Sequence, residues 1–362
     1  MNSINKIFYE FIQVSLGCRE KLSRTPNKDE WMYLFQMAEK QAVTGFLYSS
    51  LDSLSARGQK PPLDSLYEWI GVSEQMKQRN LLLNKKSVEL VKRFKNDGFR
   101  TCLLKGQGNA LMYPDPLLRT PGDIDIWVDG SRKVIRDYVK NQYPNAQDGD
   151  MHIEYPIFED IPVEVHYFPR YSNVPKYDKR LKAWFMHYSD VQFSNRVKLS
   201  SECSEYVCVP TAHFNAVQQM SHIMGHFFNE GVGLRQFVDY FYVLRNLHEQ
   251  KVSDNFEGLF ENLGMLKFAR GVMWVEQNVL GLEETYLLTI PDEKIGKVIL
   301  KEIEYGGNFG QFDKRYKARK YGMLMRGISD SYRLLQLSYY FPLDAFWKIV
   351  DKVVNQRWKI KL

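Results

Sequence analysis

Residues 103–108, LLKGQG, and residues 119–128, RTPGDIDIWV, decide the fold of this 362-residue chain. The first stretch is typical of a short apolar strand that ends in a glycine turn and opens a helix. The second is typical of a strand that carries two aspartates. Because alternate side chains of a strand share a face, Asp123 and Asp125 point to one side, whereas Ile124, Ile126 and Val128 point into a core.

Two carboxylates side by side on one strand repel each other, and each is costly to bury without a partner. A divalent cation between them removes that cost, and hard oxygen ligands suit Mg²⁺. The pattern therefore predicts a metal site that receives a phosphate. For the same reason, we expect Asn at either Asp123 or Asp125 to raise the stability of the metal-free protein. The alternation also fits an edge strand with one solvated face, where the charges only discourage aggregation.

A third carboxylate follows in the stretch VEVHY at residues 163–167. Period-two alternation puts Glu164 and His166 on one face of a strand, opposite Val163 and Val165. We expect strands at 100–104, 123–128, 151–158 and 161–168, a helix at about 131–142, and a hairpin that turns at residues 159–160. Glu164 is then able to join the aspartate pair from a neighbouring strand.

These motifs resemble those of the polymerase-beta-like nucleotidyltransferase superfamily. More narrowly, LLKG, RTPGDIDIWV and VEVHY are similar to a bacterial group known as uncharacterised nucleotidyltransferases. GLRQFVD at residues 233–239 and GGNFG at residues 306–310 are similar to the later signatures of that group. The resemblance spans roughly residues 40–310 and is densest at 103–128.

The resemblance implies transfer of a nucleoside monophosphate from a nucleoside triphosphate such as ATP to the hydroxyl of an undefined acceptor, with release of pyrophosphate. It implies two Mg²⁺ ions, for which Mn²⁺ is an alternative. Asp123 and Asp125 would hold both metals. Glu164 would bind the catalytic metal and help to deprotonate the acceptor.

The expected triphosphate contacts depart from the superfamily pattern at the glycine turn. The usual Gly-Ser is replaced here by Lys105, Gly106 and Gln107, so the serine hydroxyl is missing. Gly106 still allows close backbone approach at a helix N-terminus, which is a natural anion site, and Lys105 adds positive charge. We expect three further contacts from Arg119, Gly122 and Arg235, although Arg235 is also placed to form an intrahelical ion pair with Asp239.

Composition fits a folded protein with 44% apolar and 25% charged residues. No apolar run reaches the ~20 residues that a membrane span needs, and the first residues do not fit a signal peptide. The four cysteines have no metal-binding spacing, so we expect reduced thiols in a cytoplasmic protein.

Apolar periodicity predicts an α+β fold: a small mixed β-sheet core with helices on one face, flanked by N- and C-terminal helical regions. The expected organisation is a helical region at 1–98, a nucleotidyltransferase core at 99–209, a helical region at 210–310 and a basic tail at 311–362. Helices fit best at 65–94, 211–229, 233–250, 254–263, 266–280 and 293–305.

The tail has twelve Lys and Arg residues against four Asp and Glu, a net charge of +8, so the rest of the chain carries −2 of the total +6. Cations alternate with tyrosines at 314–321, as on surfaces that bind nucleic acid or phosphate. Residues 343–358 fit an amphipathic helix with Phe346, Ile349, Val350 and Val353 on its apolar side. The tail at 314–361 is therefore a candidate site for an anionic partner or a membrane surface, or a terminal helix packed on the protein.

Two other functions fit parts of the sequence. Nucleotide-sugar glycosyltransferases also use Asp-x-Asp, although their motif usually follows a βαβ nucleotide-binding region rather than about a hundred helical residues. A non-catalytic nucleotide-binding adaptor fits the missing serine but not three mutually repelling carboxylates. His222 and His226 lack the Glu that a zinc protease has after its first His; we expect them to pack near the cleft.

Overall fold

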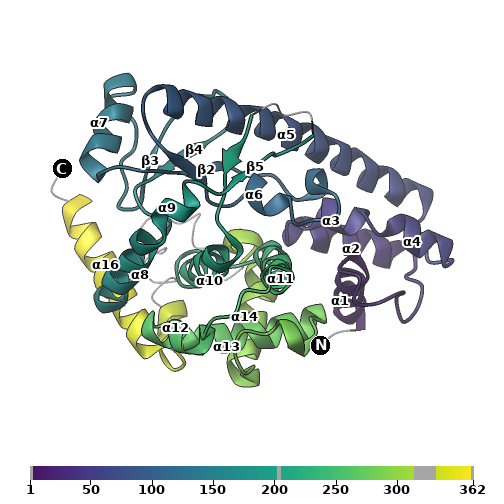
Figure 1. Ribbon diagram of the computed structural model, residues 1–362. Coiled ribbons are helices and arrows are strands. Elements are labelled where there is room, and N and C mark those ends of the chain that lie inside the picture. The colour runs from purple at the N-terminus through teal and green to yellow at the C-terminus, as the bar shows by residue number, and fades with distance from the viewer. Residues whose placement is uncertain (1–2, 202–204, 314–331, 360–362) are drawn as a thin grey trace.

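The computed structural model describes residues 3–201, 205–313 and 332–359. Among these residues the fold is α+β, with a four-stranded mixed sheet in a largely helical molecule (Figure 1). The strand order is β1(Thr101–Leu103), β2(Ile124–Val128), β4(Val163–His166) and β3(His152–Glu154). β2 and β4 are parallel and the two outer pairs are antiparallel. The expected strands and the β3–β4 hairpin are confirmed, although each strand is shorter than the apolar pattern suggested.

One face of the sheet is covered by apolar helices. Ile126 and Val165 are fully buried there in one hydrophobic cluster with Leu90 and Phe94 of α5(Leu63–Asn96) and Val139 of α7(Arg132–Gln142). Figure 1 shows the long helix α5 running along this side of the sheet. The second half of α5 therefore belongs to the sheet layer, although the sequence placed it in a separate helical region.

The other face of the sheet looks toward the C-terminal helices α10(Ala212–Asn229) and α11(Leu234–Glu249). Trp127 points to this side of β2, and its ring lies 5.9 Å from the ring of Phe214 on α10 at an interplanar angle of 15°. Asp125 lies on the same side because it is two residues from Trp127. The acidic face of the sheet and α10–α11 thus enclose the region where the predicted site residues meet.

A second and larger hydrophobic cluster joins the N-terminal helices to the C-terminal ones, and it contains residues such as Trp31, Trp69 and Phe237. The N-terminal helices are α1(Ser3–Ser15), α2(Lys28–Lys40), α3(Thr44–Tyr48), α4(Leu51–Ala56) and the first half of α5. The C-terminal ones include α12(Phe256–Asn262), α13(Leu266–Val275), a π-helical turn at Glu276–Leu280 and α14(Glu293–Gly306). The helices expected in both regions are confirmed.

The stretch between β4 and α10 was not resolved into elements by the sequence. It contains α8(Pro175–His187), the single turn α9(Ser189–Gln192) and a short hairpin of β5(Arg196–Val197) and β6(Val207–Cys208). Single turns of 3₁₀-helix lie at Pro116–Leu118, Glu284–Tyr286 and Asn308–Gly310. The helix that opens at Gly106, α6(Gln107–Ala110), is only four residues long.

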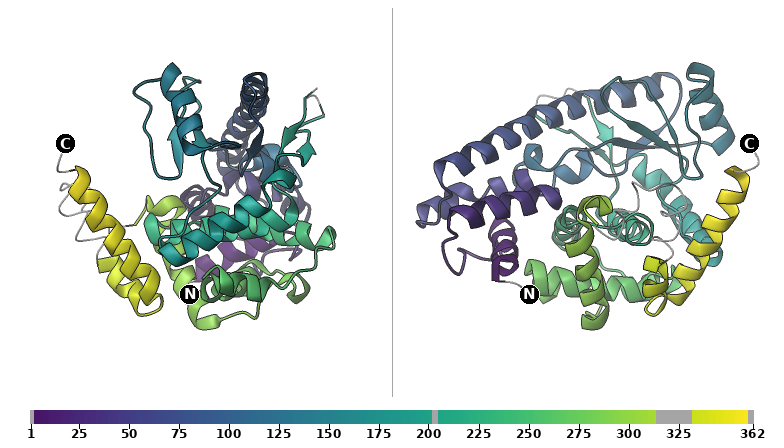
Figure 2. Two further views of the ribbon diagram at one scale, coloured as in Figure 1. Left: turned by 60° about the vertical axis from the view of Figure 1, so that its left-hand side comes forward. Right: turned by 180° about the vertical axis from the view of Figure 1, so that it is seen from behind.

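The end of the chain is helical at residues 332–338 and in α16(Pro342–Lys359). α16 runs along one side of the molecule in both views of Figure 2. Ala345 and Lys348 are buried, whereas Phe346 is 58% exposed. Phe346 of the apolar side expected from the sequence is thus exposed, whereas Lys348 from outside that side is buried. The basic stretch at 314–321 lies outside the described residues.

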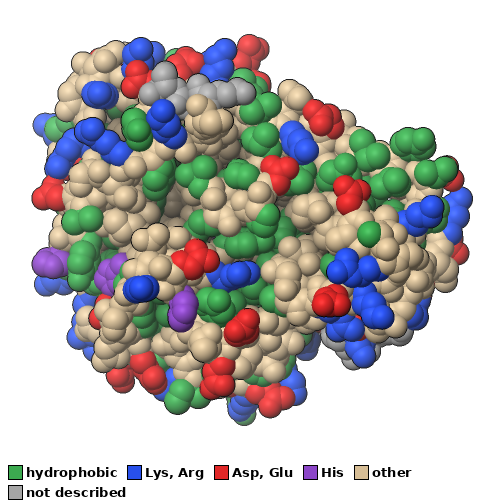
Figure 3. Space-filling view, turned by 45° about the vertical axis from the view of Figure 1, so that its right-hand side comes forward, with side chains coloured by type: hydrophobic (Ala, Val, Ile, Leu, Met, Phe, Trp, Pro, Cys, Tyr) green, Lys and Arg blue, Asp and Glu red, His purple; other side chains and the backbone are tan. Residues whose placement is uncertain are grey.

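The surface and the thiols fit the composition. Acidic and basic side chains are interspersed over the face drawn in Figure 3, as the near-neutral charge of residues 1–310 suggests. Cys18, Cys102 and Cys208 are free thiols, and Cys203 lies outside the described residues. None of the described helices has the length and apolar character needed to cross a membrane.

Candidate active site

A cavity of about 700 Å³ lies between the acidic face of the sheet and the helices α10 and α11. The sheet side supplies Lys105, Asp123, Asp125 and Glu164. The opposite wall is formed by polar side chains of α10, α11 and the turn at residues 308–311, among them His222, His226, Glu230, Arg235, Gln236, Asn308 and Gln311. Polar groups thus converge on the cavity from segments that are far apart in the sequence.

The sheet register brings together the three acids that the sequence singled out. Asp125 on β2 is paired with Glu164 on the parallel strand β4, and Asp123 precedes β2 by one residue. A carboxylate oxygen of each of these three residues lies within 4.8 Å of the other two, which is close enough to share a metal ion. Strand alternation and a parallel neighbour are sufficient to build this cluster.

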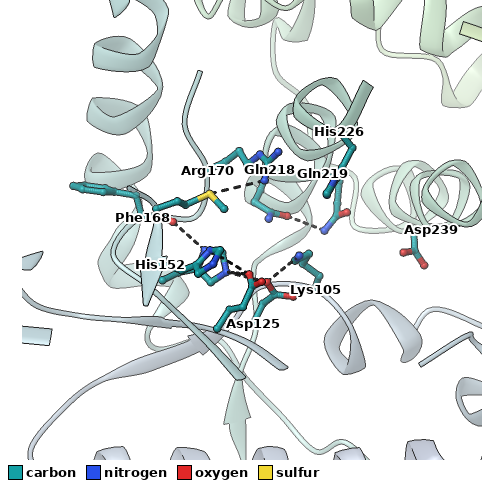
Figure 4. A network of polar contacts seen from close by, with 12 residues as sticks. Lys105, Asp125, His152, Phe168, Arg170, Gln218, Gln219, His226 and Asp239 are labelled. Carbon is teal, nitrogen blue, oxygen red and sulfur yellow. Dashed lines mark hydrogen bonds and ion pairs between the residues drawn. The ribbon is translucent and has the colours of Figure 1, made fainter. Parts of the chain in front are cut away.

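Asp125 is the most strongly held of the three acids. Its Oδ1 lies 2.9 Å from Lys105 Nζ and 2.8 Å from His166 Nε2, and Figure 4 shows the Lys105 side chain pointing to the Asp125 carboxylate. Burial disfavours the Asp125 anion, but the charges of Lys105 and His166 outweigh it and hold the pKa of Asp125 well below its usual range. Asp125 is therefore an anion in the metal-free protein.

Asp123 has the opposite electrostatic environment. Repulsion from the Asp125 carboxylate, followed by burial, raises the pKa of Asp123. Lys105 attenuates this effect but bonds to Asp125 rather than to Asp123. The aspartate pair thus has the charge imbalance that a bound cation relieves.

Two histidines extend the acidic cluster across the sheet. Glu164 Oε2 lies 3.3 Å from His152 Nδ1 and 3.4 Å from His166 Nε2. His166 Nδ1 lies 3.3 Å from the carbonyl oxygen of Phe168, so both of its ring nitrogens face oxygen atoms. This arrangement favours the doubly protonated ring. Burial opposes that charge, but the hydrogen bonds to Asp125 and Glu164 outweigh it and raise the pKa of His166. The sequence placed His166 beside Glu164, but neither histidine was predicted as a site residue.

The predicted nucleotide contacts divide into two groups. Lys105, Gly106 and Gly122 line the cavity beside the acids, and Gly106 has a φ of +56°, which favours glycine. The Gln107 side chain turns away, because its Nε2 donates to Asn84 Oδ1 of α5 at 2.6 Å. The turn is therefore present, but the amide that replaces the usual serine hydroxyl packs against α5.

Arg119 is held by a buried carboxylate. Its Nε and Nη2 donate to the two oxygens of Asp239 on α11, each at 2.7 Å, and Tyr113 Oη donates to the same carboxylate at 2.7 Å. The Arg119 guanidinium thus binds Asp239 on α11, although Arg119 also lines the cavity. The alternative of an Arg235–Asp239 ion pair is wrong, because Asp239 pairs with Arg119.

Arg235 lies on the wall near Gly122, and its guanidinium forms no ion pair with a carboxylate in the part of the chain that the structure describes. Its guanidinium sits 5.3 Å from the ring centroid of Phe309, and its buried Nε has no hydrogen-bond partner among the described residues. Burial, and then the neighbouring charge of Arg119, lower the pKa of Arg235. An unpaired guanidinium at this point is suited to an anion.

His222 and His226 lie together on α10 at the cavity wall, with ring centroids 4.3 Å apart. Burial lowers the pKa of His226 to about 4 and holds the pKa of His222 well below its usual range. Both rings are therefore neutral at pH 7. His226 Nδ1 lies 3.1 Å from Glu230 Oε2, and both histidines pack at the cavity wall, near the cleft as expected.

Comparison with known proteins places the sequence of the chain in a family. Residues 27–281 match the family described as uncharacterised nucleotidyltransferase. A crystal structure of an antigenic nucleotidyltransferase-like protein from Paracoccidioides brasiliensis is similar to the chain, with 12% identity and a TM-score of 0.35. That similarity covers 62% of this chain and 97% of the other. No curated protein matches the chain.

Proposed function

Since the chain belongs to the family of uncharacterised nucleotidyltransferases, we propose that it transfers a nucleoside monophosphate from a nucleoside triphosphate to an acceptor hydroxyl in a divalent-metal-dependent reaction. The observation that carries the proposal is the convergence of Asp123, Asp125 and Glu164 on one point of the cavity wall. A stable fold has no need of three adjacent carboxylates, because their mutual repulsion is unfavourable without a cation.

The residues around the three acids fit a divalent cation. The proposed ligands are carboxylate oxygens, which suit Mg²⁺ or Mn²⁺, and repulsion between Asp123 and Asp125 already raises the pKa of Asp123. Asp123, Asp125 and Glu164 would hold the ions. When bound, they would supply charge stabilisation for an in-line displacement at phosphorus. Lys105 Nζ, which lies 2.9 Å from Asp125 Oδ1 in their absence, would be released toward the triphosphate.

The chain's own residues then have distinct roles. Lys105, Arg235 and the backbone around Gly106 and Gly122 bind and orient the triphosphate along the β1–β2 side of the cavity. Glu164 takes the proton of the acceptor hydroxyl while the hydroxyl oxygen of the acceptor attacks the α-phosphorus. The bond between the α-phosphorus and the bridging oxygen to the β-phosphate breaks, and its electron pair leaves with pyrophosphate. Atoms and charge balance without a redox partner.

The test is to incubate the full chain with each α-labelled nucleoside triphosphate and Mg²⁺ or Mn²⁺, in the presence of cell extract. We expect release of pyrophosphate and transfer of label to an acceptor, both abolished by EDTA. The double variant Asp123→Asn/Asp125→Asn is the control for contaminating activity.

The same assay separates the other two functions. Release of a nucleoside diphosphate from a sugar nucleotide, with no pyrophosphate from any triphosphate, would identify a glycosyltransferase. Triphosphate binding without turnover in any extract would identify an adaptor. Either result would overturn the proposal.

A further inference from the structure

Arg170 is a buried cation that forms no ion pair with a carboxylate among the described residues. It lies in the loop after β4, lines the cavity and is 6% exposed. Its Nε has no hydrogen-bond partner among the described residues, and its Nη1 donates to the thioether sulfur of Met151 at 3.9 Å. Glu230 lines the same cavity, but its carboxylate accepts from His226. Burial lowers the pKa of Arg170, and the more distant charges of Glu230, Asp125 and Glu164 offset this effect only in part.

The protein makes room for this guanidinium on α10. A Cβ at Gly225 would collide with the Nη2, Nε and Cζ atoms of Arg170. Figure 4 shows Arg170 beside Gln218 and across from Asp125 and His152. Because Gly225 has no side chain, the Arg170 guanidinium can pack directly against α10 at the cavity wall. The space at Gly225 is thus filled by a guanidinium whose Nε has no hydrogen-bond partner among the described residues.

Arg170 lies at the opposite end of the site from the expected triphosphate contacts. The strand order across the sheet is β1, β2, β4 and β3. Lys105 follows β1, the two aspartates lie at β2, and Glu164 lies on β4. Met151 directly precedes β3 at the far edge. Neighbouring strands are about 4.8 Å apart, so Met151 and Arg170 are two strands away from the aspartate pair, on the far side of Glu164. Arg235, by contrast, lies next to Gly122.

We propose that Arg170 forms an anion subsite for the acceptor, so that the acceptor carries a phosphate or a carboxylate near the hydroxyl that is modified. This inference rests on the proposed function, which places the triphosphate on the β1–β2 side and the acceptor beside Glu164. A guanidinium binds either anion through paired N–H groups. The free charge of Arg170 is then neutralised only when the acceptor is bound, and neutral hydroxyl compounds are poor acceptors.

The experiment measures thermal unfolding of the full chain during titration with inorganic phosphate or with acetate. The protein is studied alone and with saturating Mg²⁺ and a non-hydrolysable triphosphate analogue. We expect phosphate to raise the unfolding midpoint of the wild type in the presence of the analogue. Arg170→Met should need at least about tenfold more phosphate for the same shift, because charged hydrogen bonds are lost. A response to acetate that matches the phosphate response would assign a carboxylate acceptor instead.

Two further variants test whether the phosphate response depends on the position of the Arg170 guanidinium and is separate from triphosphate binding. Gly225→Ala displaces the guanidinium without removing its charge and should weaken the phosphate response as Arg170→Met does. Arg235→Met, the matched control on the triphosphate side, should lower affinity for the analogue and leave the phosphate response intact. In anion-free buffer Arg170→Met should unfold at a higher temperature than the wild type, since it removes an unpaired buried charge.

Three results would overturn the inference. The first is a phosphate response of Arg170→Met that equals that of the wild type. The second is a loss of stability of Arg170→Met in anion-free buffer, which would show that Arg170 has a structural role. The third is loss of the wild-type phosphate response once the analogue is bound, which would assign Arg170 to the triphosphate. Failure of the proposed function is separate: if no analogue binds, a phosphate response that Arg170→Met loses and Arg235→Met retains still supports the subsite.

Discussion

Asp123 and Asp125 lie two residues apart on one strand, yet the charges around them differ. Asp125 is buried and accepts from Lys105 and His166. Asp123 is partly exposed and has no ion pair among the described residues. From the sequence alone the two positions are equivalent, and removal of either charge is expected to raise the stability of the metal-free protein. The structure separates them.

We predict opposite effects of the two Asn variants in EDTA. Asp125→Asn should lower the free energy of unfolding by about 3 kcal/mol, because it leaves the buried Lys105 without its anion and removes one of the two carboxylates beside His166. Asp123→Asn should raise the unfolding midpoint, because it removes the repulsion that raises the Asp123 pKa. Thermal and urea unfolding of both variants measure these changes. Equal shifts in one direction would show that the Lys105–Asp125 contact does not contribute to stability.

Glu164→Gln tests the chemistry at the third acid. The variant keeps the size of the side chain, and Asp123 and Asp125 still bind the nucleotide-bound metal. We expect a near-normal Kd for a triphosphate in calorimetry with Mg²⁺, and turnover lower by about 10²–10⁴-fold because the base is lost. Near-wild-type turnover would remove Glu164 from the reaction and direct attention to Glu154, its partner across the β3–β4 register.

The site could be predicted from sequence where local spacing determines it. Strand alternation is enough to put Asp123, Asp125 and Glu164 together, since all three lie on or beside two neighbouring strands. Arg119, Gln107 and Arg170 depend on long-range packing. Arg119 pairs with a residue 120 positions away, Gln107 meets α5, and the space for Arg170 is made by Gly225 on α10. No local pattern contains this information.

The π-helical turn Glu276–Leu280 at the end of α13 contains a buried acid with no partner. Glu276 is fully buried, and neither carboxylate oxygen has a hydrogen bond among the described residues. Burial raises its pKa well above the ordinary 4.5. The carboxyl is therefore protonated in the folded protein at pH values where the unfolded chain has lost the proton, so folding becomes less favourable as pH rises above about 4.5.

Glu276→Gln should remove this pH dependence. We expect the variant to gain stability relative to the wild type as the pH rises from 5 to 7, because Gln has no proton to lose. Each pH unit inside the titration window is worth at most about 1.4 kcal/mol. Urea unfolding at several pH values measures the difference, with the exposed neighbour Glu283→Gln as the matched control. A difference that does not change with pH would mean that Glu276 is ionised in the folded state.

Helices were predicted more fully than the surroundings of the sheet, for a physical reason. α5, α10, α11 and α14 have an apolar stripe that recurs at helical spacing, and this pattern is local. The segment from 169 to 209 has elements of two to thirteen residues, and their order is fixed by contacts such as the packing of Phe193 on Trp127 at 4.5 Å. The sequence predicted a helix after the glycine turn without setting its length, and α6 ends after four residues, before the turns that contain Pro114 and Pro116.

At the scale of the whole molecule, two hydrophobic clusters are joined across the site. One contains the sheet, α7 and the second half of α5, and the other contains the N- and C-terminal helices. Arg119 and Asp239 bridge them, since Arg119 precedes β2 by five residues and Asp239 lies on α11. The pair fixes the wall opposite the three acids, so its loss should affect both the stability of the molecule and the geometry of the cavity.

A double-mutant cycle on this pair is the test at this scale. Asp239→Asn should lower the free energy of unfolding by about 3–5 kcal/mol, because it leaves the Arg119 guanidinium buried without its carboxylate. Asp239→Asn/Arg119→Met should recover much of that loss, because an uncharged side chain then fills the same space. Urea unfolding measures the four proteins, and strictly additive effects would show that the two residues are not coupled.

If the double variant folds but binds a triphosphate more than tenfold more weakly in calorimetry, Arg119 would again be assigned to the nucleotide site. We expect its affinity to stay within that range, because Lys105 and Arg235 keep their places beside the acids.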